Sequence, residues 1–334
     1  MVNYLAIETS CDETAAAIVE DGRRLRSHCL FSQTVTHAAF GGVVPEVAAR
    51  EHLEVINQVI AQTLKEAALT DKELDGVACT LGPGLIGTLL VGISAAKALS
   101  WSWDLPLIGV DHLAAHVCAN YLETDLKPPF VALLVSGGHT QILHCRSYRE
   151  SEVLGETLDD AVGEAYDKVA RLLGLGYPGG PMIDKLAGTG NCQAFNFPEG
   201  VVSGFNFSFS GLKTAVLRTL EKLHAPIPVA DLAASFQEAV VRVLVRKTIE
   251  AQKRTGAQSI VLAGGVAANS ELRRQLKEQS PVPVFWPAAQ FCTDNAAMVA
   301  AAAYFCPITG QEPLTAYSRS KDRRRHQLDS SRNQ

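Results

Sequence analysis

The chain has 334 residues, enough for about two domains of ordinary size. Its hydrophobic content of 47% is sufficient for a real core and excludes an intrinsically disordered chain. The 30 Lys and Arg residues against 35 Asp and Glu residues give a net charge of −5, which argues against a protein that holds nucleic acid by its overall charge.

Two segments of the chain resemble one another. Residues 4–19 and 130–145 each show an apolar run, a short polar turn and a second apolar run, which predicts two strands joined by a tight loop. Further strand signals and then helices follow each of them. A recurrence at about 125 residues is too long for a solenoid repeat, so it predicts two related domains.

Between these segments, the pattern predicts a helix over 46–68, with one apolar face formed by Leu53, Ile56, Ile60, Leu64 and Ala67. A buried strand is expected over 75–84, where it runs into a Gly/Pro loop. A helix over 85–100 and a strand over 105–112 follow. The charged, proline-ended segment 123–129 is the expected domain boundary.

The second half continues the alternation of helices and strands. Helices are predicted over 159–173, 232–249, 270–278 and 294–305, and strands at 259–269 and 282–288, with a Gly/Pro loop at 174–181. The inward face of the helix over 232–249 should carry Leu232, Phe236, Val240, Val243 and Leu244. Buried strands that alternate with helices predict layered α/β domains.

A candidate metal site is found in the segment DHLAAH, which places His112 and His116 four residues apart. On a helix both would lie on one face, where two imidazoles can reach one divalent metal ion. Leu113 stands where a zinc metalloprotease has its glutamate, so that activity is not expected. Asp294 is a candidate third ligand, although an Asp at a helix start is also typical of an N-cap. The alternative is that both histidines are ordinary core or surface residues.

Three glycine-rich turns, at 136–139, 178–181 and 263–269, would allow a ligand to approach the backbone closely. None of them matches a complete phosphate-loop or dinucleotide motif, and each alone is typical of a plain turn. Together, with buried strands before two of them, they predict a nucleotide site. Asp12 and Glu13 lie beside Glu8 in an acidic turn, which suits a cation site or simply a solvated loop.

In order and spacing, the chain resembles the TsaD family of tRNA N6-threonylcarbamoyladenosine transferases. The resemblance covers residues 3–306 and rests on the motifs IETSCDETAAAIV, GGVVPEVAAREH, DHLAAH, LLVSGGHTQ, GEAYDKVARLLGLGYPGGP, FSFSGLKTA, LAGGVAAN and CTDNAAM. It implies two duplicated α/β domains of the actin/Hsp70/sugar-kinase (ASKHA) type around a central cleft. The expected subdomains are 1–125 with about 300–334, and 126–299.

The resemblance also implies a reaction and its residues. The threonylcarbamoyl group would move from threonylcarbamoyl-AMP to N6 of adenosine 37 in tRNAs that read ANN codons, and AMP would be released. The implied ligands of one divalent ion (iron first, with zinc or magnesium as alternatives) are His112, His116 and Asp294. The implied substrate-binding residues are Leu134, Val135, Ser136, Gly137, Gly138, Asp167, Gly180, Asp184 and Asn269. Asp12 or Glu13 is our candidate for the group that removes the N6 proton.

The implied partners are tRNA, a TsaB-like paralogue and a TsaE-like ATPase, with a TsaC-type enzyme that makes the donor. The first residues, MVNYLAIETS, show no secretory signal and no stretch reaches the length of a membrane span, so we expect a cytoplasmic protein. A tRNA substrate requires local positive charge in a chain of net charge −5. A basic patch, the arginines at 323–325 or a basic partner would supply it, and the isolated chain should bind tRNA weakly and in a salt-dependent way.

Two rival functions fit the same fold. A kinase or ATPase would transfer a phosphoryl group to a small molecule from the same cleft, but the histidine pair and the lack of a recognisable sugar pocket argue against it. A non-enzymatic scaffold would have no need of intact metal ligands.

Overall fold

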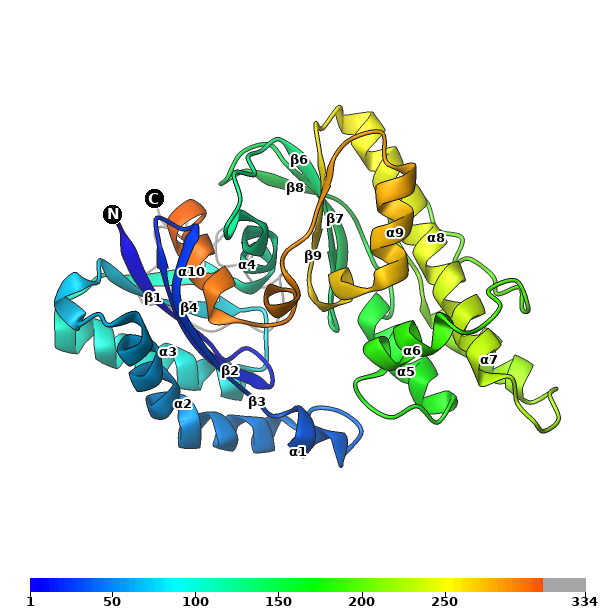
Figure 1. Cartoon of the computed structure of the whole chain (residues 1–334), viewed down its shortest axis with the longest axis horizontal. Helices are drawn as coiled ribbons and strands as arrows, with labels where there is room; N and C mark the ends of the chain where they lie inside the picture. Colours follow the sequence, from blue (N-terminus) through cyan, green and yellow to red (C-terminus); the bar gives the residue numbers. More distant parts are fainter. Residues whose placement is uncertain (309–334) are drawn as a thin grey trace, which may run out of the picture. The chain divides into compact units, whose positions relative to one another are not determined.

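The computed structural model describes residues 1–308, which form two compact units (Figure 1). The first unit consists of Met1–Leu126 together with the described residues from Asp294 onward, and the second is Lys127–Thr293. Every helix in the described part of the chain is too short or too polar to span a bilayer. The arginines at 323–325 lie outside the described residues.

The first unit is built on a five-stranded mixed sheet with the order β3-β2-β1-β4-β5. β1 pairs antiparallel with β2 and parallel with β4, so the sheet changes direction at its centre. The strands are β1 (Asn3–Glu8), β2 (Glu13–Glu20), β3 (Arg24–Ser32), β4 (Gly76–Gly82) and β5 (Leu107–Asp111). The helices are α1 (Thr34–Ala38), α2 (Pro45–Ala67), α3 (Ile86–Trp103), α4 (His112–Cys118) and α10 (Ala296–Phe305).

Helices cover both faces of this sheet, which explains why its central strands are apolar throughout. Leu5 and Ile7 of β1 pack with Ile56 and Ile60 of α2 in one core cluster. The alternate residue Ala6 belongs to the opposite face, and α10 contacts β1 and β2. Small side chains on that face allow the alanine-rich α10 to pack closely against the strands.

The second unit repeats the same sheet. Its order is β10-β9-β6-β7-β8, with β6 antiparallel to β7 and parallel to β9. The strands are β6 (Phe130–Val135), β7 (Thr140–Cys145), β8 (Ser151–Glu156), β9 (Ile260–Ala263) and β10 (Val284–Phe285). The helices are α5 (Val162–Leu172), α6 (Gly179–Ala187), α7 (Ser210–Leu220), α8 (Val229–Thr255) and α9 (Ser270–Gln279). The predicted duplication is therefore confirmed strand by strand.

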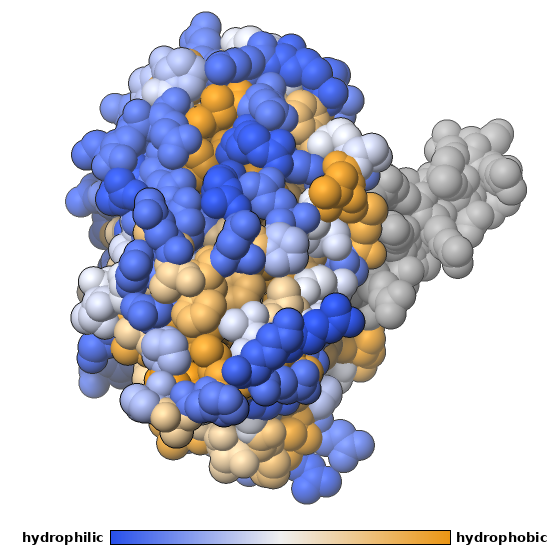
Figure 2. Space-filling view, turned by 90° about the vertical axis from the view of Figure 1, so that its right-hand side faces the viewer, coloured by the Kyte–Doolittle hydropathy of each residue, from blue (hydrophilic) through white to orange (hydrophobic). Residues whose placement is uncertain are grey.

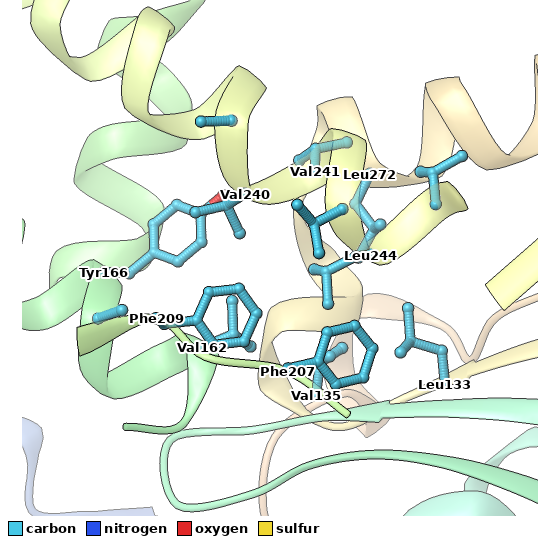
Figure 3. Close-up of a cluster of buried hydrophobic side chains, with 14 of the residues drawn as sticks. Leu133, Val135, Val162, Tyr166, Phe207, Phe209, Val240, Val241, Leu244 and Leu272 are labelled. Carbon is cyan, nitrogen blue, oxygen red and sulfur yellow. The ribbon is translucent and has the colours of Figure 1, made fainter. Parts of the chain in front are cut away.

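The core of the second unit lies between its sheet and α8. Figure 3 shows Leu133 and Val135 of β6 facing Val240 and Leu244 of α8, with two phenylalanines between them. Those two rings, Phe207 and Phe209, come from the segment before α7 and are fully buried. The face of the molecule in Figure 2 is mostly hydrophilic, with separate hydrophobic spots.

Some predicted details are wrong. Leu53 is 63% exposed, because α2 turns His52, Ile56 and Val59 inward instead. α5 begins at Val162 rather than 159, since the Asp159 side chain accepts the backbone N–H of Phe209 (2.8 Å) outside the helix. The predicted loop at 174–181 ends early, because Gly179 already starts α6.

Candidate functional site

The first candidate site is formed by His112, His116 and Asp294 in the first unit. One ligand atom from each residue lies within 4.8 Å of the other two. Nε2 of His116 is 3.1 Å from Oδ1 of Asp294, and Nε2 of His112 is 3.6 Å from the same oxygen. The sequence analysis expected these three residues together, and the start of α4 and the start of α10 bring them to one point.

These residues fit a metal ion on the evidence of their own hydrogen bonding. His116 is 1% exposed, and neither of its ring nitrogens has a well-oriented hydrogen-bond partner. A buried imidazole without such partners is costly unless another group takes its lone pair. Two imidazoles and one carboxylate form a ligand set typical of zinc and iron sites.

Asp294 is not an N-cap, which was the alternative for this residue. The cap of α10 is Asn295, whose Oδ1 accepts the backbone N–H of Met298 at 2.9 Å. Asp294 is thereby left to face the histidines. Burial opposes its charge, but the rings of His112 and His116 outweigh burial and hold the pKa of Asp294 well below its ordinary value.

Glu8 is a further residue of this site; the sequence analysis named it only as a neighbour of the acidic turn and did not connect it with the histidines. It is fully buried at the end of β1, and its Oε2 lies 3.3 Å from Nδ1 of His112. The same carboxylate accepts hydrogen bonds from the backbone N–H of Ser10 (2.5 Å) and from the hydroxyl of Thr80 (2.6 Å). A carboxylate behind a histidine fixes the tautomer of its ring and turns Nε2 toward the metal position.

Glu8 and His112 each favour the charged form of the other. Burial opposes the protonated ring, but the carboxylates of Asp294 and Glu8 outweigh burial and raise the pKa of His112 to about 9. Burial also opposes the ionised Glu8, and the His112 ring outweighs it, so the pKa of Glu8 lies below its ordinary value.

Replacing Glu8 with Gln should therefore weaken metal binding by about 10- to 100-fold, because His112 loses the carboxylate that orients its ring. The measurement is a metal dissociation constant by competition with a chelator. Thr80→Val is the matched control, since it removes another partner of the same oxygen but leaves the Glu8 charge beside His112. Equal metal affinities in folded Glu8→Gln and wild-type protein would contradict this role.

Asp12 lies in the turn between β1 and β2, Glu13 is the first residue of β2, and two neighbouring segments hold this turn. The backbone N–H of Gln33 donates to the carbonyl of Asp12 at 3.0 Å. His52, fully buried on α2, lies 3.0 Å from the carbonyl of Cys11 through Nε2 and 2.6 Å from the Thr14 hydroxyl through Nδ1. Burial lowers the pKa of His52, so the ring is neutral, and the carbonyl requires its proton on Nε2.

Glu13 gives the turn a measurable pH dependence. Burial, together with the carboxylates of Asp12 and Asp294, raises the pKa of Glu13 from 4.5 to about 9. The folded protein then keeps a proton that the unfolded chain has lost, so stability is full below pH 4.5 and falls as pH rises toward 9.

We therefore expect metal-free wild-type protein to lose stability relative to Glu13→Gln as pH rises through this interval. Denaturant unfolding at several pH values measures the difference. A difference that stays constant with pH would show that Glu13 titrates at its ordinary value.

The second group of predicted residues lies in the second unit, at the loop between β6 and β7. Leu134 and Val135 are fully buried strand residues, whereas Gly137 and Gly138 are exposed. Ser136 closes the loop: its backbone N–H donates to the carbonyl of His139 at 2.8 Å. A Cβ at either glycine would meet no atom within 4 Å, so the loop leaves open space above its backbone.

The start of α5 packs tightly under this loop. The backbone N–H of Gly163 donates to the carbonyl of Ser136 at 3.2 Å, and a Cβ on Gly163 would lie 2.6 Å from the same oxygen. Position 163 therefore requires glycine. The sequence analysis did not single it out, because its neighbour is 27 residues away in the chain and the contact depends on the fold.

The remaining predicted residues lie around the ends of α6 and α9. Asp167 of α5 accepts the backbone N–H of Gly179 at 2.7 Å, so its carboxylate anchors the first turn of α6. Burial raises the pKa of Asp167. Asp184 of α6 accepts from Ser270, through the backbone N–H at 3.0 Å and the hydroxyl at 2.9 Å. Asn269 is the N-cap of α9, and Gly180 faces open space.

With this geometry in place, comparison with known proteins identifies the family. Residues 24–301 match the family model described as TsaD: tRNA N6-adenosine threonylcarbamoyltransferase. The chain belongs to the TsaD family. A tRNA N6-adenosine threonylcarbamoyltransferase of Clostridium perfringens is 53% identical over 315 residues, which cover 92% of this chain and 93% of that protein. One of Thermosipho africanus is 54% identical over 307 residues, covering 90% and 93%.

Solved structures with low sequence identity share the fold. HypF of T. kodakarensis matches 90% of this chain and 47% of its own, with a TM-score of 0.64 and 18% sequence identity. The likeness shows the fold alone, and it agrees with the predicted actin/Hsp70/sugar-kinase type. As a TsaD family member the protein is a transferase that modifies N6 of adenosine in tRNA. No comparison favours the rival kinase or ATPase.

Proposed function

We propose that the protein transfers the threonylcarbamoyl group from threonylcarbamoyl-AMP to N6 of adenosine 37 in tRNAs that read ANN codons, and releases AMP. The observation that carries this proposal is the cluster of His112, His116 and Asp294, whose ligand atoms lie within 4.8 Å of one another around a buried imidazole. A phosphoryl-transfer enzyme of the same fold would have no evident use for this cluster.

The donor is a mixed carbamic–phosphoric anhydride, so it is already activated and no covalent enzyme intermediate is required. The task of the chain is to position the two substrates and to stabilise the charge that develops as N6 attacks. Exposed Gly137 and Gly138 allow phosphate oxygens to reach the loop backbone. The side chains of Leu134 and Val135 are buried, so these residues would act only through their backbone, at the end of β6 that leads into the loop. Asp167, Gly180, Asp184 and Asn269 would hold the adenosine.

A divalent ion on His112, His116 and Asp294 would supply Lewis-acid stabilisation of the donor oxygens. The ligand set favours iron or zinc over magnesium, because magnesium prefers oxygen ligands alone. We propose iron first, with zinc as the alternative. Glu8 would keep His112 oriented for this role through its contact with Nδ1.

Of the two candidate bases for the N6 proton, we favour Asp12. Burial and the carboxylates around it raise the pKa of Glu13 to about 9, so Glu13 carries a proton at neutral pH and cannot accept another. The flipped adenine would have to approach the turn that His52 and Gln33 hold.

We propose a TsaB-like paralogue as the partner of α2 and α3. These helices border an apolar groove of about 250 Å³, lined by Asn57, Ile60, Ala61, Leu64, Ala95, Ala98 and Leu99. A TsaE-like ATPase would join the complex, and the partners or a local basic patch would supply the charge that tRNA requires. We further propose that the two compact units are the two duplicated subdomains, and that the protein works in the cytoplasm with its tRNA substrate.

A charge in the groove should prevent this association. Ala61→Glu and Ala98→Glu each place a carboxylate at an exposed position of the groove, so the isolated chain should fold normally while the partner complex is lost. Size-exclusion chromatography with the purified TsaB-like protein measures the complex.

The matched control for these variants is Gln62→Glu. It adds the same carboxylate at another exposed position of α2, about 100° around the helix from Ala61 and outside the groove lining. The control should bind the partner as wild type does. Undiminished complexes of both groove variants would place the interface elsewhere.

The experiment that tests the function is a transfer assay with unmodified tRNA, threonylcarbamoyl-AMP and the TsaB- and TsaE-like partners, read as modified nucleoside. We expect product only with a tRNA that has adenosine at position 37. Absence of product with every component present would refute the proposed reaction. Turnover of ATP with a small-molecule acceptor in its place would support the kinase.

A further inference from the structure

Gln237 is a buried glutamine that joins two of the residues proposed to hold the adenosine. It lies on α8, is 4% exposed, and belongs to no motif that the sequence analysis singled out. Its Nε2 donates to Oδ1 of Asp184 at 3.1 Å, and its Oε1 accepts from Nδ2 of Asn269 at 2.8 Å. One side-chain amide therefore connects α6, α8 and the start of α9.

The direction of this hydrogen-bond chain is fixed at both ends. The backbone N–H of Leu272 donates to Oδ1 of Asn269 at 2.9 Å, so the NH₂ group of Asn269 must face Gln237. Gln237 then accepts with its oxygen and turns its own NH₂ group toward Asp184. A carboxylate can only accept, so the orientation of both amides follows from the groups at the two ends of the chain.

Asp184 is held on its buried side and left partly open on the other. Its two oxygens accept three hydrogen bonds, from the hydroxyl of Ser270, the backbone N–H of Ser270 and the amide of Gln237. A carboxylate offers about four lone-pair positions. The Asp184 side chain is only half-buried, so the remaining position is available to a hydroxyl donor from a ligand.

We propose that Gln237 is a positioning residue for the nucleotide: it holds the carboxylate of Asp184 in the orientation in which it accepts a ribose hydroxyl of the adenosine moiety. This inference rests on the proposed function, in which Asp184 and Asn269 bind the adenosine. The side-chain amide of Gln237 is required because its NH₂ group donates to Asp184 and its oxygen accepts from Asn269. An apolar side chain would remove the amide donor of Asp184 and would leave Nδ2 of Asn269 only the Tyr166 hydroxyl at 3.5 Å, whereas a carboxylate would repel Asp184.

The test measures AMP binding by calorimetry to the full chain. Gln237→Leu should bind AMP about tenfold more weakly, the loss expected when a charged acceptor loses one hydrogen bond. The same variant should bind 2′,3′-dideoxy-AMP as wild type does, because that ligand has no ribose hydroxyl to donate. Gln252→Leu is the matched control: Gln252 is also buried on α8, but its Nε2 donates to the backbone carbonyl of Ala257 at 2.7 Å.

A second variant distinguishes a specific loss of AMP binding from a loss of folding, because its defect should be reversible with pH. Gln237→Glu places two carboxylates side by side, so AMP binding should be weak at about pH 8 and should recover at about pH 5.5, where a shared proton restores the donor. Wild type should show no such recovery. Equal AMP affinities of wild type and Gln237→Leu, or equal losses for AMP and dideoxy-AMP, would overturn the role of Gln237 alone. Failure of wild type to bind AMP would overturn the proposed adenosine site as well.

Discussion

The double replacement of His112 and His116 with alanine should abolish metal retention and threonylcarbamoyl transfer together. Both rings belong to the cluster whose ligand atoms lie within 4.8 Å, and the variant keeps only the carboxylate of Asp294 there. The rate of transfer should fall on the order of a thousandfold or more, because a Lewis acid at the reacting oxygens supplies several kcal/mol of stabilisation. Elemental analysis of the purified protein and the tRNA assay measure the two losses.

The control for this experiment is His144→Ala, since His144 lies on β7 in the second unit and is not one of the three residues of the cluster. It should keep both the metal and the activity. Because His112 and His116 are buried, His116→Gln serves as a variant of similar volume, and thermal unfolding checks each protein. Full transfer activity in a metal-free, folded double variant would refute the scheme.

Gly180→Ala should lose nucleotide binding without losing stability. A Cβ at this position would meet no atom of the protein within 4 Å, so the added methyl group is harmless to the fold. Replacement of a helical glycine by alanine even stabilises by about 0.5–1 kcal/mol. If the adenosine lies against Gly180, the methyl group occupies its space, and AMP affinity should fall at least about tenfold by calorimetry.

Gly211→Ala provides a closely matched control. Gly211 is the second residue of α7, as Gly180 is of α6, and a Cβ there also meets open space. Both variants should unfold at or slightly above the wild-type temperature, and only Gly180→Ala should bind AMP poorly. Wild-type affinity in Gly180→Ala would show that the nucleotide binds elsewhere.

Much of the fold could be predicted from local patterns. Apolar runs broken by a short turn predicted both strand pairs and hence the duplication, because strands that are covered on both faces are apolar at nearly every position. Periodicity was less reliable at a helix with a partly exposed apolar face. Leu53 follows the expected spacing, but the sheet takes the face that includes His52, which no hydrophobicity pattern would place inside.

The candidate sites divide in a similar way. The spacing of His112 and His116 predicted one face of a helix; Asp294 was a candidate third ligand with an N-cap as its alternative, and the family resemblance favoured the ligand. The acidic turn pointed to a possible cation site near Glu8, but the contact of Glu8 with His112 and the role of Gln237 could not be predicted, because they depend on residues 104 and 53 or 32 positions away. A glutamine within the long helix α8 carries no local signal of function. The importance of both residues follows only from the three-dimensional hydrogen bonds.

Helix α2 connects the acidic turn with the apolar groove, because residues of this one helix contact the turn and line the groove. His52 lies near its start and is bonded to the carbonyl of Cys11 at the acidic turn, while Asn57 begins the groove on the same helix. The two positions are five residues apart, about 7.5 Å along the axis. A partner that grips the groove and slides α2 along its axis would therefore pull directly on the turn that carries Asp12. Binding of the proposed partner would then be coupled, through α2, to the position of Asp12, the proposed proton acceptor.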